Sequence, residues 1–130
     1  MKGILDTSVV IDLDDARVVE FLPELTAVSA VTIAELGVGA ALAKDRVTAA
    51  RRQFRLQQVE SSFPSLPFTV NTARHFALLS SHLVDLGMAH RPRIADAMIA
   101  ATAVEHGIPL YTRDRGMSVF DPFLRVYLID

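Results

Sequence analysis

The sequence predicts an α/β fold in which helices cover both faces of a central, mostly parallel sheet, giving three layers. Short apolar, β-prone runs alternate along the chain with longer segments whose apolar residues recur at helical spacing. That order is typical of parallel sheets, because each strand needs a crossover helix to bring the next one back in the same direction. The first strand also ends in a carboxylate, Asp6, which places a charge at the sheet edge where such folds bind ligands.

The composition is that of one domain spanning residues 1–130. The chain has no cysteine, which excludes disulfides, thiolate metal ligands and a cysteine nucleophile. No apolar run reaches the ~18 residues of a membrane span, and the N-terminus lacks the pattern of a signal peptide. We therefore expect a cytoplasmic protein with no membrane partner.

Charge does not decide the class of partner. The net charge is −2, which neither favours nor excludes nucleic acid. Arginine supplies 11 of the 13 basic residues, and its planar guanidinium suits phosphate recognition, although genomic base composition explains the bias equally well.

The first half of the chain is expected to form two strands and several helices. Residues 4–6 are a buried strand, and residues 7–13 are one or two helical turns whose entry, Thr7-Ser8, suits a helix cap. Residues 16–25 have helical spacing interrupted by Pro23, residues 26–30 are a strand, and residues 32–43 are a helix. Residues 45–63 predict an amphipathic helix with Val47, Phe54 and Val59 on its apolar side.

The second half repeats the alternation. Residues 67–70 are a strand candidate, and Asn71 is expected to cap a helix over residues 72–86 that ends at Gly87. A helix over residues 94–105 ends at Gly107. Strands are expected over residues 108–112 and 125–129, with a turn at residues 113–116 between them.

Four acidic residues differ from the solvated remainder, because each follows a strand or begins a helix among apolar neighbours: Asp6, Glu35, Asp96 and Asp114. Each also has an ordinary structural explanation. Asp6 is a suitable helix cap, Glu35 would complete a capping box with Thr32, Asp96 would favour a helix dipole, and Asp114 is a common turn residue.

Taken together, the four carboxylates indicate a metal site. In an open parallel sheet they would meet at the carboxyl edge, where buried like charges either become protonated or recruit a cation. An oxygen-only ligand set suits Mg²⁺ or Mn²⁺, and zinc is disfavoured because no histidine pair has ligand spacing. Such an ion activates water and stabilises a phosphodiester during displacement.

Arginines on both sides of the candidate site would bind the phosphates of such a substrate: Arg91, Arg93, Arg113 and Arg115. The alternative explanation is that they are solvated helix and turn ends that partly neutralise the carboxylates.

Four blocks of sequence resemble the motifs of PIN-domain ribonucleases, and specifically the VapC-type toxins of type II toxin-antitoxin pairs. They are LDTSVVI at residues 5–11, SAVTIAEL at 29–36, RIADAMIAATA at 93–103 and PLYTRD at 109–114. The blocks cover nearly the whole chain in the order and spacing of that family.

This resemblance implies a three-layer α/β/α PIN-like fold and a Mg²⁺- or Mn²⁺-dependent endoribonuclease that leaves a 3′-hydroxyl and a 5′-phosphate. The implied metal ligands and catalytic residues are Asp6, Glu35, Asp96 and Asp114, of which Asp6 and Asp96 are the principal ligands. Ser8 and Thr112 match hydroxyl positions near the family's site. One departure is that Met117 and Ser118 stand where many relatives carry a further acid, so the resemblance leaves one or two ions open.

The resemblance also implies partners. These are RNA, a second copy in a homodimer, and a VapB-like antitoxin through which operator DNA would be reached indirectly. Residues 9–11 and 16–25 are candidates for the antitoxin groove, with ordinary core as the alternative for about half of them.

Two other functions remain open from sequence. A non-catalytic PIN-like module that binds RNA or protein would explain the missing acid at Met117. A small phosphohydrolase is disfavoured, because Asp6-Thr7-Ser8 lacks the second aspartate of a D-x-D signature.

Overall fold

A central parallel sheet organises the molecule, as the sequence predicted. The computed structural model describes residues 2–89 and 91–130. Within these residues five strands pair in the order β3-β2-β1-β4-β5, and every pairing is parallel. The strands are β1 (Lys2–Leu5), β2 (Leu25–Ser29), β3 (Ser65–Leu66), β4 (Leu110–Thr112) and β5 (Val126–Leu128).

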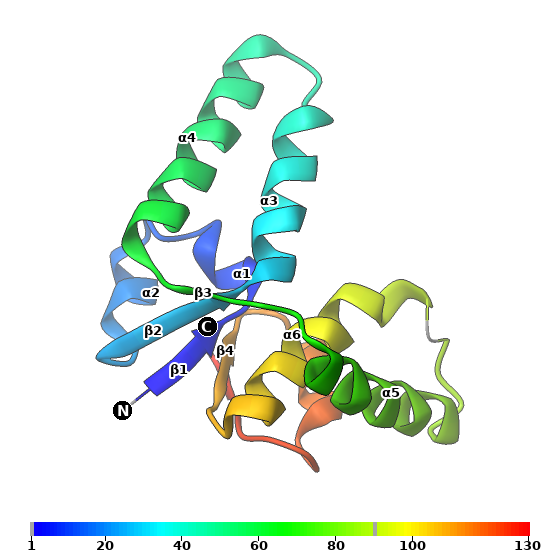
Figure 1. Ribbon diagram of the computed structural model, residues 1–130. Coiled ribbons are helices and arrows are strands. Elements are labelled where there is room, and N and C mark those ends of the chain that lie inside the picture. The colour runs from blue at the N-terminus through cyan, green and yellow to red at the C-terminus, as the bar shows by residue number, and fades with distance from the viewer. Residues whose placement is uncertain (1, 90) are drawn as a thin grey trace.

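Helices cover both faces of this sheet and complete the three layers (Figure 1). One side carries α1 (Thr7–Val10), α2 (Ala16–Glu20), α3 (Ala30–Ala41) and α4 (Arg46–Ser62). The other carries α5 (Val70–Asp85), α6 (Ile94–His106) and the 3₁₀ segment η2 (Arg115–Phe120), and a second 3₁₀ turn, η1 (Arg91–Arg93), leads into α6.

Each face of the sheet has its own hydrophobic core, because successive residues of a strand point to opposite sides. Ile4 and Leu110 pack with Leu79 of α5 and Ile99 of α6. Their strand neighbours, such as Leu5, join the second core. That core includes Val9, Val18, Val28, Leu36, Val59 and Tyr111. Burial on both faces explains why the strands read as continuous apolar runs.

Several element boundaries differ from the sequence prediction. The strand expected at residues 67–70 lies instead at Ser65–Leu66, because Pro67 has no N–H to donate to the sheet. The helix expected to continue to residue 25 ends at Glu20, before Pro23. Asn71 lies inside α5, and its expected capping role is taken by Thr69.

Thr69 begins α5 through a reciprocal capping box with Thr72. The Thr72 hydroxyl also donates to Glu105 of α6 at 2.5 Å, and Asn71 Nδ2 donates to the same carboxylate at 3.2 Å. This group of polar contacts ties the start of α5 to the end of α6. Gly107 then ends α6 in a left-handed conformation, φ 63°, as its sequence position predicted.

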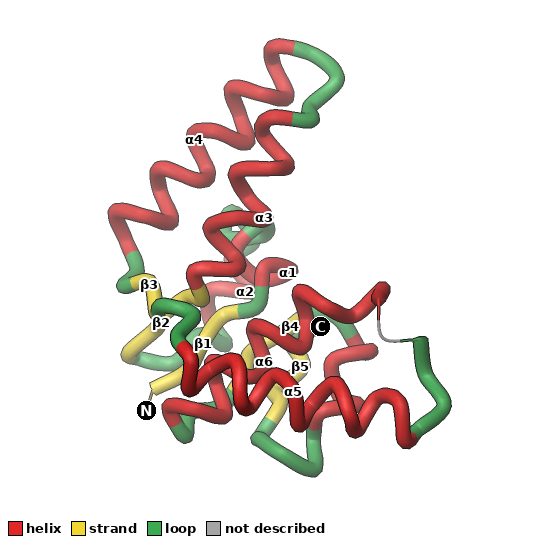
Figure 2. Tube along the Cα trace, turned by 45° about the vertical axis from the view of Figure 1, so that its right-hand side comes forward, coloured by secondary structure: helices red, strands yellow, loops and turns green. Residues whose placement is uncertain are grey.

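The helices α3 and α4 form a two-helix arm that stands away from the sheet (Figure 2). The core does not cover Val47 and Phe54, two residues predicted for the apolar side of α4, since these residues are 69% and 68% exposed. Val59, near the sheet end of α4, is buried as expected. The amphipathic pattern of α4 therefore predicts burial correctly only at the base of the arm, where the sheet is close enough to cover the apolar side chains.

Among the described residues, no helix has the length and apolar character needed to cross a lipid bilayer.

Candidate active site at the carboxyl edge of the sheet

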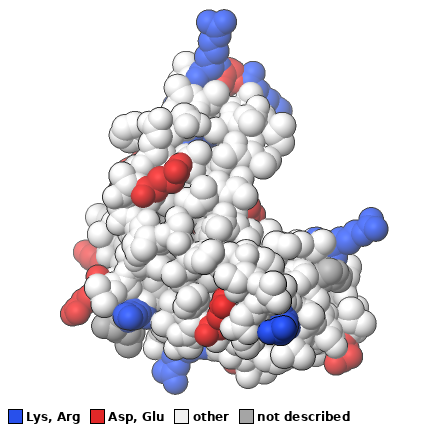
Figure 3. Space-filling model, in the orientation of Figure 1, with Lys and Arg blue, Asp and Glu red and all other residues white. Residues whose placement is uncertain are grey.

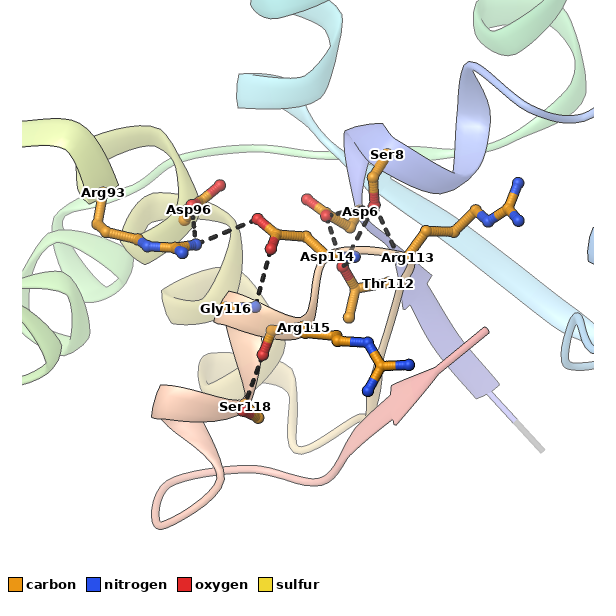
Figure 4. Close-up of polar contacts among 10 residues, drawn as sticks. All are labelled: Asp6, Ser8, Arg93, Asp96, Thr112, Arg113, Asp114, Arg115, Gly116 and Ser118. Carbon is orange, nitrogen blue, oxygen red and sulfur yellow. Dashed lines mark hydrogen bonds and ion pairs between the residues drawn. The ribbon is translucent and has the colours of Figure 1, made fainter. Parts of the chain in front are cut away.

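The candidate site lies where β1 and β4 end side by side (Figure 4). Asp6 directly follows β1, Thr112 is the last residue of β4, and Asp114 comes two residues later. Asp96 reaches the same place from the first turn of α6. Three separate segments of the chain therefore converge at the carboxyl edge of the sheet, the position that parallel sheets use for ligands.

Asp6 is the most enclosed of these carboxylates, with 4% of its surface exposed. Its Oδ2 accepts hydrogen bonds from Ser8 Oγ and from Thr112 Oγ1, each at 2.7 Å. The carboxylate does not cap α1, so the structural alternative for this residue does not apply. Neutral hydroxyl donors hold the side chain in place without cancelling its charge.

The two hydroxyls also join the ends of the strands to the following loop. Ser8 Oγ accepts from the backbone N–H of Arg113 at 2.9 Å, and Thr112 Oγ1 accepts from the N–H of Asp114 at 3.0 Å. The hydroxyls of Ser8 and Thr112 lie 3.2 Å apart. Both hydroxyls therefore lie beside Asp6, whereas the resemblance implied only that they match positions near the family's site.

Asp96 and Asp114 are held together by one guanidinium. Arg93 Nη1 donates to Asp96 Oδ2 at 2.8 Å and to Asp114 Oδ2 at 3.2 Å. The other oxygen of Asp114 accepts from the Gly116 N–H at 2.8 Å. All of these side chains are only partly buried, with Asp114 the most exposed of the three ionic groups at 45%.

The electrostatics link three of the carboxylates. Burial is the largest effect, and it raises the pKa of Asp96 above its ordinary value because it disfavours the charged form. The hydrogen bond from Arg93 opposes this shift, whereas the negative charges of Asp6 and Asp114 add to it. Asp6 and Asp114 thus both lie close enough to act on Asp96, and the three carboxylates are called the acidic cluster below.

Glu35 lies beside this cluster and has different partners. Its Oε1 accepts from Thr7 Oγ1 at 2.6 Å, and the same hydroxyl lies 3.0 Å from that of Thr32. The expected capping box is absent, because α3 begins two residues earlier at Ala30 with Ser29 as its cap. Glu35 is connected to the site through Thr7, the residue next to Asp6.

Glu35 also lines a groove of about 450 Å³ between α1 and the arm. Its other polar wall is formed by three arginines of α4: Arg51, Arg52 and Arg55. The sequence showed these arginines only as the polar side of a helix. Their spacing indicates that positions 51, 52 and 55 share one face of α4. The residues across the groove from that face are known only from the tertiary structure.

Of the four arginines expected to bind phosphate, Arg93 is the one whose described contacts include the acidic cluster. Arg113 Nη1 instead donates to Asp12 at 2.9 Å, and Arg115 lies 3.6 Å from Asp130 at the exposed C-terminal end. Arg91 is exposed in η1. Figure 3 shows the surface hollowed between the arm and the α5–α6 part, with basic residues scattered over this face rather than gathered in a patch.

The acidic cluster suits a hard divalent ion in its chemistry, since every donor is a carboxylate or hydroxyl oxygen. Among residues 2–89 and 91–130, however, no three His, Cys, Asp or Glu side chains are grouped in a way that could hold a metal ion as they stand. The positive charge between Asp96 and Asp114 is that of Arg93. The donor types therefore fit such an ion, and the carboxylates would have to move together to bind it.

Met117, which stands where the resemblance implied a further acid, is fully buried in the core below α6. It contributes packing instead of an oxygen ligand. Ser118, which follows it, is exposed and donates to the carbonyl of Arg115 at 2.8 Å. Neither side chain can replace the missing carboxylate.

Comparison with known proteins supports the motif assignment. The PIN domain family matches residues 3–121. Ribonuclease VapC5 of Mycobacterium tuberculosis is 35% identical over 129 residues, covering 98% of this chain and 93% of the relative. The resemblance inferred from four short blocks therefore extends over the whole fold.

Two solved structures are similar in fold as well as in sequence. The VapBC-5 structure from Mycobacterium tuberculosis, a member of the VapBC family of toxin-antitoxin systems, has a TM-score of 0.83 and 34% identity, with 98% of this chain and 97% of that chain covered. FitAcB from Neisseria gonorrhoeae has a TM-score of 0.77 and 31% identity, with 96% of each chain covered.

Proposed function

Because this chain belongs to the PIN domain family, we propose that it is an endoribonuclease that depends on Mg²⁺ or Mn²⁺ and acts as the toxin of a toxin-antitoxin pair. The convergence of Asp6, Asp96 and Asp114 at the carboxyl edge of the sheet supports the enzymatic part. The similarity to curated VapC ribonucleases over nearly the full chain supports RNA as the substrate.

In this proposal the three clustered carboxylates hold the ion, and Glu35 stands at its edge through Thr7. A bound Mg²⁺ or Mn²⁺ would supply an activated water and charge stabilisation for hydrolysis to a 3′-hydroxyl and a 5′-phosphate. Ser8 and Thr112 fix the rotamer of Asp6 by donating to one of its oxygens, so that the carboxylate keeps its charge and direction. Arg93, whose guanidinium contacts Asp96 and Asp114, is the proposed phosphate-binding group at this edge.

The proposed partner is a VapB-like antitoxin, as in the VapBC-5 complex. Val9 and Val10 are fully buried in the core, so the expectation that these two residues line a docking groove is wrong. Ile11, which is 54% exposed, lines the same groove as Glu35, and Phe21 of the other candidate segment is 61% exposed. A homodimer, a cytoplasmic location and indirect binding of operator DNA through the antitoxin belong to the same proposal.

The test is RNA cleavage by purified protein with Mg²⁺ or Mn²⁺ and with EDTA. We expect cleavage with either ion, none with EDTA, and at least a hundredfold loss in Asp96→Asn, because loss of an outer-shell partner alone reduces metal-site activity roughly 10–100-fold. Asp85→Asn removes the same charge from the exposed end of α5 and should cleave normally. Full activity of a folded Asp96→Asn variant would refute the proposed site.

A second candidate is a PIN-like module that binds RNA or protein without cutting. It is favoured by the ion pairs of Arg93, which already neutralise part of the acidic cluster, and by Met117 in place of an acid. Isothermal titration separates the two. RNA retention without any Mn²⁺ binding would favour the module over the enzyme.

Coexpression tests the toxin assignment. A short open reading frame immediately upstream that encodes a DNA-binding protein is the expected antitoxin gene. Its product should copurify with the chain and abolish RNA cleavage. An upstream product that leaves cleavage unchanged would contradict this part of the proposal.

A further inference from the structure

Arg93 occupies an unusual place for an arginine at the start of a helix. Its guanidinium lies inside the acidic cluster, with one nitrogen, Nη1, shared between Asp96 and Asp114. The side chain is 23% exposed, about as much as that of Arg113 at 24%, whereas that of Arg115, the residue after Asp114, is 82% exposed. Burial is therefore shared with Arg113, and what sets Arg93 apart is that both of its acidic partners belong to the acidic cluster.

Gly116 makes room for that guanidinium. A Cβ atom added at Gly116 would clash with Arg93 Nη2 and would lie 2.6 Å from Cζ and 2.8 Å from Nη1. The guanidinium therefore lies directly against the Gly116 backbone, whose N–H donates to Asp114. The backbone conformation of Gly116 is one that other residues adopt, so the feature that favours glycine here is the close approach of Arg93, whose guanidinium would have to shift to admit a larger residue.

Arg93 takes one oxygen from each of two carboxylates that would hold the divalent ion in our proposal. Asp96 Oδ2 and Asp114 Oδ2 both accept from the guanidinium. A guanidinium has donors but no lone pair, so it cannot share an ion with these carboxylates as a ligand. Two positive charges in the same pocket would also repel each other. The guanidinium and the ion are therefore alternative partners for Asp96 and Asp114.

We propose that Arg93 is an internal counter-ion that competes with the divalent ion for Asp96 and Asp114, and that Gly116 allows it to take this position. The proposal rests on the proposed metal-dependent function and adds a regulatory element to it. The ion enters only as the guanidinium leaves, so the wild-type affinity for metal is set below what the carboxylates alone would give.

Mn²⁺ titration by isothermal calorimetry of the metal-free, full-length protein tests this directly. Arg93→Gln should bind Mn²⁺ more tightly than wild type, by on the order of tenfold, which is typical of a coupling between two sites. Gly116→Ala keeps the arginine but pushes its guanidinium out of the cluster, so the affinity should also rise, by a smaller factor. Arg91→Gln removes the same charge from an exposed position two residues away and should change the affinity little.

Thermal melting gives a second measurement that does not depend on catalysis. Without metal, Arg93→Gln should melt below wild type, because the Asp96–Asp114 pair loses its neutralising charge. Saturating Mn²⁺ should then raise its melting temperature by more than it raises that of wild type. If Arg93→Gln fails to fold, Gly116→Ala still tests the proposal.

The outcomes separate this proposal from the function on which it rests. If wild type binds Mn²⁺ and both variants bind it equally or more weakly, Arg93 organises the carboxylates for the ion and the competition is refuted, while the metal-dependent function stands. If neither wild type nor the two variants bind Mn²⁺, the metal-dependent function fails and the competition fails with it.

Discussion

The two halves of the acidic cluster are held in opposite ways. Asp6 is buried and receives two neutral hydroxyl donors, whereas Asp96 and Asp114 are partly exposed and share a guanidinium. Hydroxyls fix a carboxylate and leave its charge intact, but a guanidinium fixes it and cancels charge. In our proposal, Asp6 could therefore bind the ion without losing a charged partner, whereas Asp96 and Asp114 would first have to release Arg93.

The largest loss of RNA cleavage should come from substitution of Asp6. Asp6→Asn is expected to reduce RNA cleavage at least a hundredfold, since it removes the most enclosed charge of the cluster. The amide retains an oxygen that can accept from Ser8 and Thr112, so circular dichroism and the melting temperature should stay close to wild type. Asp6→Asn with near-normal cleavage would mean that the two halves do not differ as described.

The next effect concerns the hydroxyl that holds Asp6. Thr112→Val keeps the shape of the side chain but leaves the buried carboxylate and the Asp114 N–H without this partner. We expect cleavage to fall roughly 10–100-fold and the free energy of unfolding to fall by about 1–3 kcal/mol, measured by urea denaturation. Thr112→Ser retains the hydroxyl and should restore most of both losses. If Ser rescued neither, the methyl group would be the important part of Thr112.

A smaller effect is expected at the edge of the cluster. Glu35→Gln should reduce cleavage by less than Asp6→Asn does, by on the order of tenfold, because Glu35 reaches the cluster only through Thr7. The amide oxygen can still accept from the Thr7 hydroxyl, so stability should change little. A loss as large as that of Asp6→Asn, measured in the same cleavage assay, would make Glu35 a full member of the cluster.

The smallest effect is a pH dependence of stability in the arginine-held half. The folded pKa of Asp96 lies above its ordinary value of 3.8, mainly because of burial, so the folded chain binds this proton more tightly. As pH rises from the ordinary pKa to above the raised pKa, ionisation of Asp96 lowers the free energy of unfolding. Asp96→Asn lacks this loss and should gain stability relative to wild type, by about 1 kcal/mol or less.

Urea denaturation between about pH 4 and pH 7 with EDTA present measures this difference, and Asp85→Asn serves as the exposed control. A variant that loses stability relative to wild type as pH rises would show that the Arg93 ion pair outweighs burial at Asp96.

The sequence predicted the order of the elements because the patterns involved are local. A continuous apolar run such as residues 4–5 reports burial on both faces, and Gly107 reports the end of a helix through its own backbone conformation. The failures have a shared cause. Val47 and Phe54 follow a helical apolar pattern, yet the arm extends beyond the sheet that would have covered them. Thr69 replaced Asn71 as a cap because both are capable of capping and the choice depends on where α5 docks.

In the candidate site, too, the sequence predicted some features and not others. The sequence alone predicted that carboxylates follow the strands, and four short blocks of sequence predicted the family. The roles of the side chains remain predictions. The partners of those carboxylates could not be read. Thr112 and Asp6 are 106 positions apart, and Arg93 and Asp114 are 21 apart. Periodicity carries no information on contacts at such separations.

By itself, then, the sequence determined the parallel α/β architecture, the position of Asp6 and Asp114 at strand ends, and membership of the PIN domain family. The tertiary structure decided which charges meet. It placed Arg93 against Gly116 and between two carboxylates, and it turned Arg113 and Arg115 toward other acids. The physical reason is that burial is encoded residue by residue, whereas an ion pair depends on how the strands register and how the helices dock on them.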